Sequence, residues 1–546
     1  MAKPTTVVLV PVWGFGHFKP MLEVGKRLLT RSGRRQLTIT VVIMPAPTPN
    51  VASEIDAHMR AEEAADPAVR VPFVAPPTDH TGPEEFVSRY VQAYAPHVEA
   101  AVSGLTLTSP VAAVVFDLFC TPLLDATRAL GVPAYVYMIT SAAMCALLLR
   151  APGLDEEVIE GEFEEEVDVP GLPPVPPSCL PSGLENRKVP TYNWFVYTGR
   201  RYMETSGIVI NTVAELEPRV LAAIADGRCT RGVRAPPVYT IGPVIPLTPH
   251  PTAAAEEEEE HECVRWLDAQ PQGSVVFLCF GGSGFFPAPQ AHEIARALER
   301  GGHRFLCVLR GPPEPPSKTP TDGDLDALLP PGFLERTNGT GLVWPRWAPQ
   351  QEILANPAVG GFVTHGGWNS VLESLWHGVP MIPWPLGAEQ PLITFELVAC
   401  MGVAVELKTC AGRGDSVQVE ATELERACRK AAEEGGSYAA MQKLAHDMLH
   451  ANTTLYTIYV HTRLLIPLTG PPEDYWVPHH RMPPRYIGVG VAVRANYVEA
   501  AELERSGLMG GVEKADEMKA VSKNQEGRGE GRIAYAARHV QKAAHE

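Results

Sequence analysis

Short apolar runs alternate with amphipathic stretches along most of the chain, and this alternation constrains the fold more than any other feature. In the first half, the runs are rich in β-branched residues and cover residues 7–12, 37–44, 111–116, 134–139 and 207–211. Stretches with helical spacing, such as residues 21–29 and 122–130, lie between them. Apolar strands that are separated by helices predict a parallel sheet covered on both faces.

A second alternating unit begins after residue 262. Its strand candidates cover residues 274–280, 305–309, 341–344, 360–364, 380–384 and 403–407. The helical patterns of this unit cover residues 287–300, 351–355, 370–377 and 390–400. A chain of 546 residues also exceeds what one core usually holds. We therefore expect an α/β protein with two Rossmann-like domains whose parallel sheets face a cleft. Ligands of such sheets bind beyond the carboxyl ends of the strands.

Changes in composition predict the domain boundaries. We expect an N-terminal domain at residues 1–248, an acidic linker at 249–262 with five successive glutamates, and a C-terminal domain at 263–470. Within the first domain, the acidic and proline-rich stretch 154–181 is typical of a mobile surface loop.

The last part of the chain, residues 471–546, is atypical. The segment 419–426 recurs at 498–505 with one difference in eight positions, as a degenerate second copy. We expect this tail to pack poorly or to remain mobile. In the alternative, the second copy replaces the first and residues 489–493 close the sheet in place of 403–407. Just before the tail, the apolar spacing of 436–452 predicts a helix that braces the first domain.

Charge and cysteine usage exclude several classes of protein. A net charge of −17 leaves no basic footprint for nucleic acid. The ten cysteines are scattered singly, so neither a zinc knuckle nor a redox dithiol is expected. The N-terminus is too abrupt for a signal peptide, and no apolar run approaches the ~18 residues of a membrane span. We expect a cytoplasmic monomer without stable membrane insertion.

A histidine follows the first predicted strand, where residues 12–20 read Val-Trp-Gly-Phe-Gly-His-Phe-Lys-Pro. The two glycines permit a tight turn, so His17 is expected on the loop at the carboxyl end of the strand. Histidine is the side chain best suited to take a proton near neutral pH. The alternative is a helix-capping or structural loop histidine.

An aspartate, Asp117, directly follows the third predicted strand. A carboxylate at this carboxyl end could bind the far nitrogen of His17, fix its tautomer and stabilise the imidazolium form. The alternative is a cap for the helix that begins near Pro122. The two residues together indicate a base with an orienting partner.

Residues 347–390 read as a strand, a glycine loop and then a helix that starts near Asn369. The glycines allow a ligand to approach the backbone, and the helix start offers free N–H groups to a diphosphate. His365 can add a hydrogen bond to that phosphate. Glu373 lies one helical turn after Asn369 and is positioned to accept ribose hydroxyls.

The ends of the same segment offer further ligand-binding groups. Trp347 presents a flat surface for a base, and Glu389 and Gln390 present hydroxyl-binding groups. A core tryptophan followed by a turn would explain single residues of the segment. It would not explain the whole ordered set.

Residues 347–390 resemble the signature of plant family-1 UDP-dependent glycosyltransferases, the box that binds the sugar donor. The similarity covers roughly residues 5–450, including GFGHFKPMLE at 14–23, DLFCT at 117–121 and WLDAQPQGSVVFLCFGG at 266–282. Part of it resembles the branch that glycosylates flavonoids and related phenolics. The resemblance implies a GT-B fold and inverting transfer of a sugar from a UDP-sugar to a hydroxyl of a small phenolic acceptor, giving a β-O-glycoside.

The resemblance also implies roles for individual residues. His17 would be the general base and Asp117 its partner. The donor would be bound by Thr140, Ser283, Trp347, Ala348, Gln350, His365, Gly367, Trp368, Asn369, Ser370, Glu373, Glu389 and Gln390. Gln390 would favour glucose. The acceptor would lie against Trp13, Phe15, Phe119 and Tyr137 beside His17. The UDP-sugar would be a co-substrate, with no metal ion and no permanently bound cofactor.

Three positions depart from the family pattern. Gly366 stands where the family usually has cysteine, and Glu389 stands where it usually has aspartate. The glycine–serine loop around Ser283 is shifted slightly from the family pattern.

Three other readings compete with this one. A dinucleotide-dependent oxidoreductase needs a third glycine where the chain has Lys19. A metal-dependent transferase would use the cluster Asp322, Asp324 and Asp326, which lies among prolines with no apolar strand before it and reads as a solvated loop. The third is an inactive or altered UDP-sugar-binding relative with a rearranged C-terminus.

Overall fold

The first sheet has seven parallel strands in the order β3-β2-β1-β4-β5-β6-β7. The computed structural model describes residues 4–32, 37–62, 68–80, 82–157, 163–245, 261–314, 319–405, 436–437 and 439–449. The strands are β1 (Thr5–Val10), β2 (Leu37–Ile43), β3 (Ala68–Arg70), β4 (Val111–Asp117), β5 (Ala134–Met138), β6 (Gly207–Ile210) and β7 (Val238–Thr240). Every residue of β4 is buried, as is every residue of β1 after Thr5, which explains their unbroken apolar sequences.

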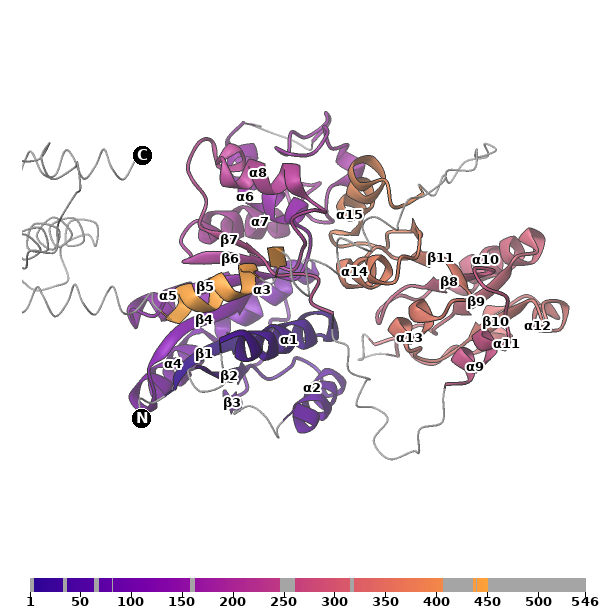
Figure 1. Ribbon diagram of the computed structural model, residues 1–546, viewed down its shortest axis with the longest axis horizontal. Coiled ribbons are helices and arrows are strands. Elements are labelled where there is room, and N and C mark those ends of the chain that lie inside the picture. The colour runs from indigo at the N-terminus through magenta and orange to yellow at the C-terminus, as the bar shows by residue number, and fades with distance from the viewer. Residues whose placement is uncertain are drawn as a thin grey trace, which may run out of the picture. The chain divides into compact units, whose positions relative to one another are not determined.

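Helices flank this sheet (Figure 1). They are α1 (Phe15–Ser32), α2 (Pro49–Glu62), α3 (Pro83–Ala93), α4 (Ala95–Thr108), α5 (Leu124–Ala129), α6 (Ala142–Glu157), α7 (Pro190–Tyr202) and α8 (Pro218–Ala225). Three short 3-10 helices are η1 (Thr121–Leu123), η2 (Pro177–Cys179) and η3 (Arg228–Thr230).

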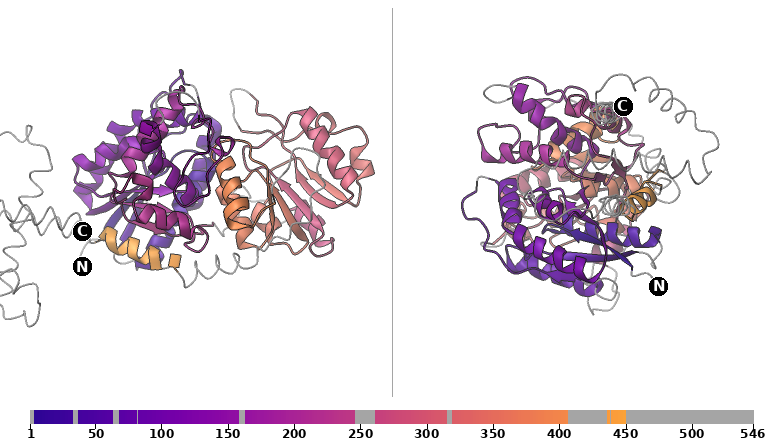
Figure 2. Two further views of the ribbon diagram at one scale, coloured as in Figure 1. Left: turned by 90° about the horizontal axis from the view of Figure 1, so that it is seen from above. Right: turned by 90° about the vertical axis from the view of Figure 1, so that its left-hand side faces the viewer.

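The second sheet has five parallel strands in the order β10-β9-β8-β11-β12. They are β8 (Val275–Cys279), β9 (Arg304–Val308), β10 (Gly341–Trp344), β11 (Val359–Thr364) and β12 (Met381–Pro383). Its helices are α9 (Glu262–Asp268), α10 (Ala288–Gly301), α11 (Leu325–Leu328), α12 (Phe333–Arg336), α13 (Gln350–Ala355), α14 (Trp368–Trp376) and α15 (Gln390–Glu396), followed by the π-helix η4 (Leu397–Met401). Two further views show helices packed beside both sheets (Figure 2). The predicted α/β class with two parallel sheets is confirmed.

The strand order reverses once in each sheet, and each reversal marks the position where a ligand is expected to bind. In the first sheet β1 pairs with both β2 and β4, and in the second β8 pairs with both β9 and β11. The loops that follow β1 and β4, or β8 and β11, therefore leave the sheet in opposite directions and leave room for a ligand. His17 follows β1 and Asp117 ends β4, whereas Ser283 follows β8 and His365 follows β11.

A helix at residues 439–449 returns to the first sheet, as the sequence predicts. Met441, Leu444 and Met448 lie in the same core cluster as β1 and β4. The Tyr239 hydroxyl donates to Oδ2 of Asp447 at 2.6 Å. Ala439, which the predicted spacing would bury, is exposed.

The structure corrects three other predictions. The three-residue strands β3 and β7 were not expected. Of the strand predicted at 403–407, the described part makes one isolated bridge between Ala404 and Met381. The stretch 154–181 begins as the last turn of α6, and its described part is packed, because Val169, Val175 and Leu180 are fully buried. The prediction of a mobile loop is wrong for that part.

Most of the predicted linker and the whole tail, residues 471–546, lie outside the described residues. The domain boundaries and the behaviour of the tail therefore stay predictions. The described residues up to Leu449 belong to one compact unit.

Candidate functional site

His17 and Asp117 meet at the carboxyl ends of β1 and β4. Nδ1 of His17 lies 2.9 Å from Oδ2 of Asp117. Asp117 is the last residue of β4 and is fully buried, and its Oδ1 accepts the backbone N–H of Phe119 at 3.0 Å. The imidazole side chain keeps 25 % of its surface exposed. The aspartate is thus held from both sides, and Nε2 of His17 is left for another partner.

The backbone around Gly14 places the histidine. Gly14 has a φ of 101°, a conformation that favours glycine. Its carbonyl accepts the N–H groups of His17 at 3.1 Å and Phe18 at 3.0 Å. Helix α1 therefore starts at Phe15, and His17 lies in its first turn. The expected position on a loop is wrong, because the glycine turn starts the helix before Pro20.

Burial and nearby charges act in opposite directions on the pKa of His17. Burial works to lower its pKa, but the charge of Asp117, the hydrogen bond to it and the charge of Glu389 raise the pKa above its ordinary value. Burial raises the pKa of Glu389, against its own backbone hydrogen bond and His17. His17 therefore binds a proton more tightly than a free histidine does.

The start of α14 contacts the first sheet and its loops. Gly367 precedes the helix, and Trp368 and Asn369 open it. Nδ2 of Asn369 donates to the carbonyl of Gly16 at 3.0 Å. Trp368 is 2 % exposed, and its indole N–H donates to the carbonyl of Asn211 at 2.6 Å. The residue next to His17 is thereby tied to the N-terminus of α14.

His365 lies between two glycines. A Cβ atom at Gly281 would come within 2.7 Å of its ring, and one at Gly367 within 2.5 Å. Burial lowers the pKa of His365 to about 4, so the ring is neutral at physiological pH. Real Cβ atoms do not approach so closely, so a larger residue at either position would force the ring of His365 to move.

A polar network connects α13 to α14. Nε2 of Gln350 donates to Oγ of Ser370 at 2.9 Å and to Oε2 of Glu373 at 2.6 Å. Gln351, which the sequence analysis did not single out, donates to Oε1 of Glu373 at 2.9 Å. Burial raises the pKa of Glu373, and the two glutamines and Lys19 act to lower it. The sequence signal that could have revealed Gln351 is its position directly after Gln350, because two adjacent glutamines can donate to one carboxylate.

The other residues that are predicted to bind the nucleotide of the donor differ in how exposed their side chains are. Trp347 is 40 % exposed, more than is usual for tryptophan, and its ring lies 6.0 Å from the ring of His261. Ala348 is buried beside it, and Ser283 is exposed on the loop after β8.

Gln390 closes a short loop. Its Oε1 accepts the backbone N–H groups of Leu386 at 2.8 Å and Gly387 at 3.1 Å. The carbonyl of Ala388 accepts the N–H of Ser182 at 3.0 Å. The oxygen of Gln390 is therefore engaged by the backbone, and its amide N–H groups are the ones left to contact a ligand.

Four of the predicted site residues hold buried polar atoms that lack a hydrogen-bond partner within the described part of the chain. These atoms are the Tyr137 hydroxyl, Oγ1 of Thr140, Nδ1 of His365 and Oδ1 of Asn369. An unsatisfied buried polar group costs about 1–3 kcal/mol and calls for an explanation. A polar ligand or water that bonds to them would provide it.

The predicted acceptor residues are largely buried. The rings of Phe119 and His17 lie 5.6 Å apart, and Tyr137 is fully buried. Trp13 is 8 % exposed, because its N–H donates to the carbonyl of Met44 at 2.7 Å and its ring stacks on Tyr90 at 4.6 Å. Tyr90 was not predicted from the sequence to lie beside Trp13. The side chain of Phe15 lies outside the described part.

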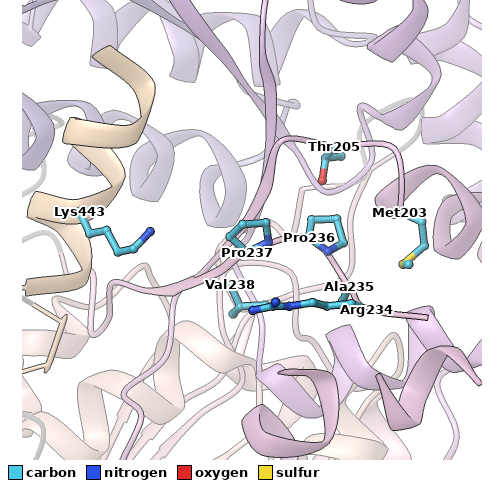
Figure 3. A pocket seen from close by; sticks show the side chains of 8 residues that line it. All are labelled: Met203, Thr205, Arg234, Ala235, Pro236, Pro237, Val238 and Lys443. Carbon is cyan, nitrogen blue, oxygen red and sulfur yellow. The ribbon is translucent and has the colours of Figure 1, made fainter. Parts of the chain in front are cut away.

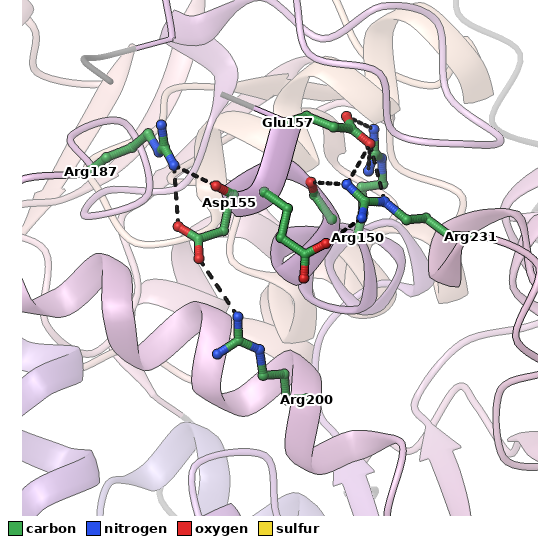
Figure 4. A network of polar contacts seen from close by, with 8 residues as sticks. Arg150, Asp155, Glu157, Arg187, Arg200 and Arg231 are labelled. Carbon is green, nitrogen blue, oxygen red and sulfur yellow. Dashed lines mark hydrogen bonds and ion pairs between the residues drawn. The ribbon is translucent and has the colours of Figure 1, made fainter. Parts of the chain in front are cut away.

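A network of arginines and carboxylates fixes the end of α6 (Figure 4). Arg150 donates to Glu157 at 2.9 Å, and Nη2 of Arg231 lies 3.1 Å from the same carboxylate. Arg187 donates to the carbonyl of Asp155 at 2.9 Å. Nε of Arg150 also donates to the carbonyl of Asp168 at 3.3 Å, so the network contacts the described part of the segment that follows α6.

Other features lie apart from these residues. A cavity of about 600 Å³ is lined by Met203, Thr205, residues 234–238 and Lys443, none of which is a predicted site residue (Figure 3).

Among the residues that the structure describes, no cluster of three or more His, Cys, Asp or Glu side chains could hold a metal ion. Asp324 caps α11 by accepting the N–H groups of Asp326 and Ala327. Within the same residues, no helix is long and apolar enough to cross a membrane.

Comparison with known proteins assigns this arrangement to a family. Residues 247–419 match the family described as UDP-glucoronosyl and UDP-glucosyl transferase. The chain is 58 % identical to a malvidin galactosylase of Oryza sativa subsp. japonica over 486 residues, which cover 82 % of this chain and 98 % of the rice protein. The chain belongs to the plant UDP-dependent glycosyltransferases.

Other members of the glycosyltransferase family share the similarity. An anthocyanidin 5,3-O-glucosyltransferase of a Rosa hybrid cultivar is 35 % identical, over 80 % of this chain and 98 % of its own length. A UGT of Siraitia grosvenorii, solved in complex with UDP, superposes with a TM-score of 0.68 at 34 % identity and covers 82 % of this chain and 100 % of its own. The two parallel sheets are thus those of the GT-B fold, and this glycosyltransferase uses a UDP-sugar.

Proposed function

We propose that this glycosyltransferase transfers a hexose from a UDP-hexose to a hydroxyl of a small phenolic acceptor of the flavonoid type, with inversion, giving a β-O-glycoside. The observation that carries the proposal is the bond between Nδ1 of His17 and Oδ2 of Asp117. It orients the imidazole at the topological switch point of the first sheet and leaves Nε2 to act on the acceptor. An inactive relative would have no catalytic use for an imidazole that a buried carboxylate orients in this way.

His17 acts as the general base in this proposal. The acceptor oxygen attacks C1 of the sugar, and its proton moves to Nε2 of His17. The bond between C1 and the diphosphate oxygen breaks, and UDP leaves with the electron pair. Asp117 stabilises the imidazolium that forms, because its carboxylate lies 2.9 Å from Nδ1.

The second sheet binds the donor. Trp347 stacks on uracil, with Ala348 and Gln350 near the base and ribose, and Glu373 accepts the ribose hydroxyls. The diphosphate lies at the N-terminus of α14, where Asn369, Ser370, His365 and the backbone at Gly367 meet it, with Ser283 from the loop after β8. Free N–H groups and the helix dipole offset the charge of the departing UDP.

The sugar lies among Thr140, Trp368, Glu389 and Gln390. The buried, unpartnered Oγ1 of Thr140 supports this placement. Helix dipole and hydrogen bonds supply the positive potential at the diphosphate, and we propose that no metal ion takes part. A monomer that acts in the cytoplasm completes the proposal.

The flavonoid-type acceptor follows from the relatives and from the residues near His17. The two relatives named above act, by name, on malvidin and on anthocyanidins. The half-buried Phe119 lies 5.6 Å from the ring of His17 and offers an apolar face to a flat phenol. Trp13, Phe15 and Tyr137 complete the acceptor side.

Two sugars compete as the donor hexose. Gln390 favours glucose by the family pattern. The 58 % identical rice protein is a galactosylase by name, which favours galactose, and an identity that extends over 486 residues outweighs one residue. The oxygen of Gln390 is also engaged by two backbone N–H groups, so it contributes less to reading the sugar. We expect galactose to be preferred.

A product analysis tests this function. The protein is incubated with an equimolar mixture of UDP-glucose and UDP-galactose and a panel of anthocyanidins, flavonols and simple phenols, and products are identified by mass and by chromatography against both glycosides. The proposal expects β-O-glycosides, mainly galactosides, on flavonoid hydroxyls. Mainly glucosides would restore the donor expected from Gln390. No transfer to any acceptor would favour the inactive relative.

A further inference from the structure

The side-chain amide of Asn369 is oriented by the backbone beside His17. Nδ2 of Asn369 lies 3.0 Å from the carbonyl oxygen of Gly16, the residue before His17. A carbonyl oxygen only accepts hydrogen bonds, so the end of the amide that faces Gly16 must be the nitrogen. The oxygen Oδ1 is therefore the end of the amide that points elsewhere.

This oxygen is buried and lacks a hydrogen-bond partner within the described part of the chain. Asn369 as a whole is partly exposed, so a ligand can lie against its side chain. A buried acceptor without a donor is unfavourable, and a ligand or water that donates to it removes this cost. Oδ1 of Asn369 is thus a candidate contact for a group of the substrates.

The chemistry of Oδ1 decides which kind of group suits it. An amide oxygen only accepts, and the oxygens of a diphosphate are acceptors as well, so the two cannot be partners. The next residue differs, because Oγ of Ser370 accepts from Nε2 of Gln350 at 2.9 Å and keeps its proton for a phosphate oxygen. The first turn of α14 therefore offers donors to a diphosphate and, at Asn369, one acceptor to a hydroxyl.

Two kinds of substrate hydroxyl already have other partners in the proposed function. The ribose hydroxyls are proposed to meet Glu373, which lies one helical turn after Asn369. The reacting hydroxyl of the acceptor carries a single proton, which moves to Nε2 of His17. The hydroxyls of the hexose and any second hydroxyl of the acceptor remain.

The position of Asn369 favours one hydroxyl of the hexose. In the proposed reaction, C1 of the hexose lies between the diphosphate that leaves and the acceptor oxygen that His17 deprotonates. Asn369 lies between the same two places, because it is in the first turn of α14 and its side chain bonds to Gly16. The hexose hydroxyl nearest to C1 is the one on C2.

We propose that Oδ1 of Asn369 accepts a hydrogen bond from the 2-hydroxyl of the donor hexose, an inference that rests on the proposed function. The backbone N–H of Asn369 still serves the diphosphate. Positive charge develops at C1 as UDP leaves and makes the neighbouring hydroxyl a stronger donor, so this bond strengthens in the transition state. Glucose and galactose carry the same 2-hydroxyl, so the inference holds for either hexose.

A binding cycle tests the contact. Calorimetry without acceptor gives the Kd values of UDP-hexose and UDP-2-deoxyhexose for the wild type and for Asn369→Ala, with the hexose that binds better. We expect the wild type to bind the 2-deoxy ligand about three- to tenfold more weakly, as for the loss of one hydrogen bond. The variant should bind both ligands with Kd values within about twofold. Loss of the contact with Gly16 affects both ligands and cancels in the ratio.

Turnover tests whether the bond strengthens during the reaction. The ratio of kcat/KM for UDP-hexose over UDP-2-deoxyhexose is measured for both proteins with saturating acceptor. We expect this ratio to be about tenfold or more larger for the wild type than for Asn369→Ala. The intrinsic reactivity of the 2-deoxy donor is common to both proteins and cancels.

UDP itself separates the sugar from the diphosphate. Asn369→Ala is expected to weaken binding of UDP-hexose by about threefold or more beyond its effect on UDP. Equal losses for UDP and UDP-hexose would overturn the proposal, because the side chain would then serve the diphosphate. Asn338→Ala, at an exposed position after α12, serves as the matched control and should bind all three ligands as the wild type does.

Two further variants cover the case in which Asn369→Ala does not fold. Asn369→Leu keeps the size of the side chain and should also bind UDP-hexose and UDP-2-deoxyhexose equally. Asn369→Asp keeps an accepting oxygen, and its negative charge weakens all the ligands together. Its ratio between the two sugar donors should therefore stay that of the wild type.

The outcomes distinguish this inference from the proposed function. The same 2-deoxy ratio in the wild type, Asn369→Ala and Asn369→Leu would overturn the contact with the 2-hydroxyl. If only the KM of the acceptor rose in these variants, Oδ1 would serve a second hydroxyl of the acceptor, which would also overturn it. If the wild type formed no glycoside from either UDP-hexose, the proposed function would fail and the inference with it.

Discussion

Asp117 contacts the imidazole of His17 at Nδ1 and not at Nε2. Nδ1 of the histidine lies 2.9 Å from Oδ2 of the aspartate, while Oδ1 of the same carboxylate accepts the N–H of Phe119. The two residues are 100 positions apart in sequence and meet because β1 and β4 are neighbours in the sheet. The contact fixes the tautomer of the imidazole, since an ionised carboxylate can only accept.

Asp117→Asn is expected to lower kcat by about 10²-fold or more, because general-base catalysis commonly contributes 10²–10⁴-fold. The wild-type rate should rise with pH and level off above an apparent pKa higher than the ~6.5 of a free histidine, because the base must lose its proton. In the variant this midpoint should move to lower pH, since burial then acts with less opposition. A pH–rate profile of both proteins measures it. Asp226→Asn, at an exposed position, serves as control, and an unmoved midpoint would contradict the pairing.

Glu373→Gln is expected to weaken UDP binding by about 10- to 100-fold, as for other hydrogen bonds to a charged group. The carboxylate accepts bonds from Gln350 and Gln351 and is proposed to accept the ribose hydroxyls. Calorimetric titration with UDP measures the change. Glu352→Gln, on the exposed side of α13, should bind UDP as the wild type does. Equal Kd values for all three proteins would remove Glu373 from the donor site.

Removal of metal ions is expected to leave transfer unchanged. The N-terminus of α14, His365 and Asn369 are proposed to offset the charge of the departing UDP. Turnover is measured after dialysis against EDTA and again after addition of magnesium or manganese. Activity that disappears with EDTA and returns with manganese would refute the metal-free mechanism.

Truncation separates the bracing helix from the tail. Removal of residues 471–546 is expected to leave Tm and kcat nearly unchanged. Removal of residues 436–546 takes away Met441, Leu444 and Met448, each of which stabilises the fold by roughly 1.5–3 kcal/mol. The longer truncation should lower Tm by about 10 °C or more or prevent folding. An insoluble or inactive product of the shorter truncation would support the alternative that the second copy completes the sheet.

The strands that carry the site were predictable because they are buried on both faces. The continuous apolar runs of β1, β4, β8 and β11 place their ends within two residues of the prediction. The strand β3, with the sequence Ala-Val-Arg, is too short to produce a pattern. The start of α1 was missed, because Pro20 is typical of a first turn and here lies inside the helix.

The order of the donor box was visible in the sequence, but the contacts between distant segments were not. Nothing local indicates that Trp368 donates to the carbonyl of Asn211, or that Asn369 donates to the carbonyl of Gly16. Their sequences are those of an ordinary amphipathic helix and a loop before a helix. Such pairs depend on how the two sheets are joined, which no periodicity encodes.

His17→Ala, measured both for transfer and for UDP binding, tests most directly whether His17 is the base. We expect kcat on an unactivated flavonoid hydroxyl to fall to the detection limit while the Kd for UDP stays within about twofold, because His17 is proposed to act on the acceptor. His303→Ala, at the exposed position directly before β9, should leave both values unchanged. Near wild-type turnover by His17→Ala, or a loss of UDP affinity that matches the loss of rate, would contradict the assignment of His17 as the base.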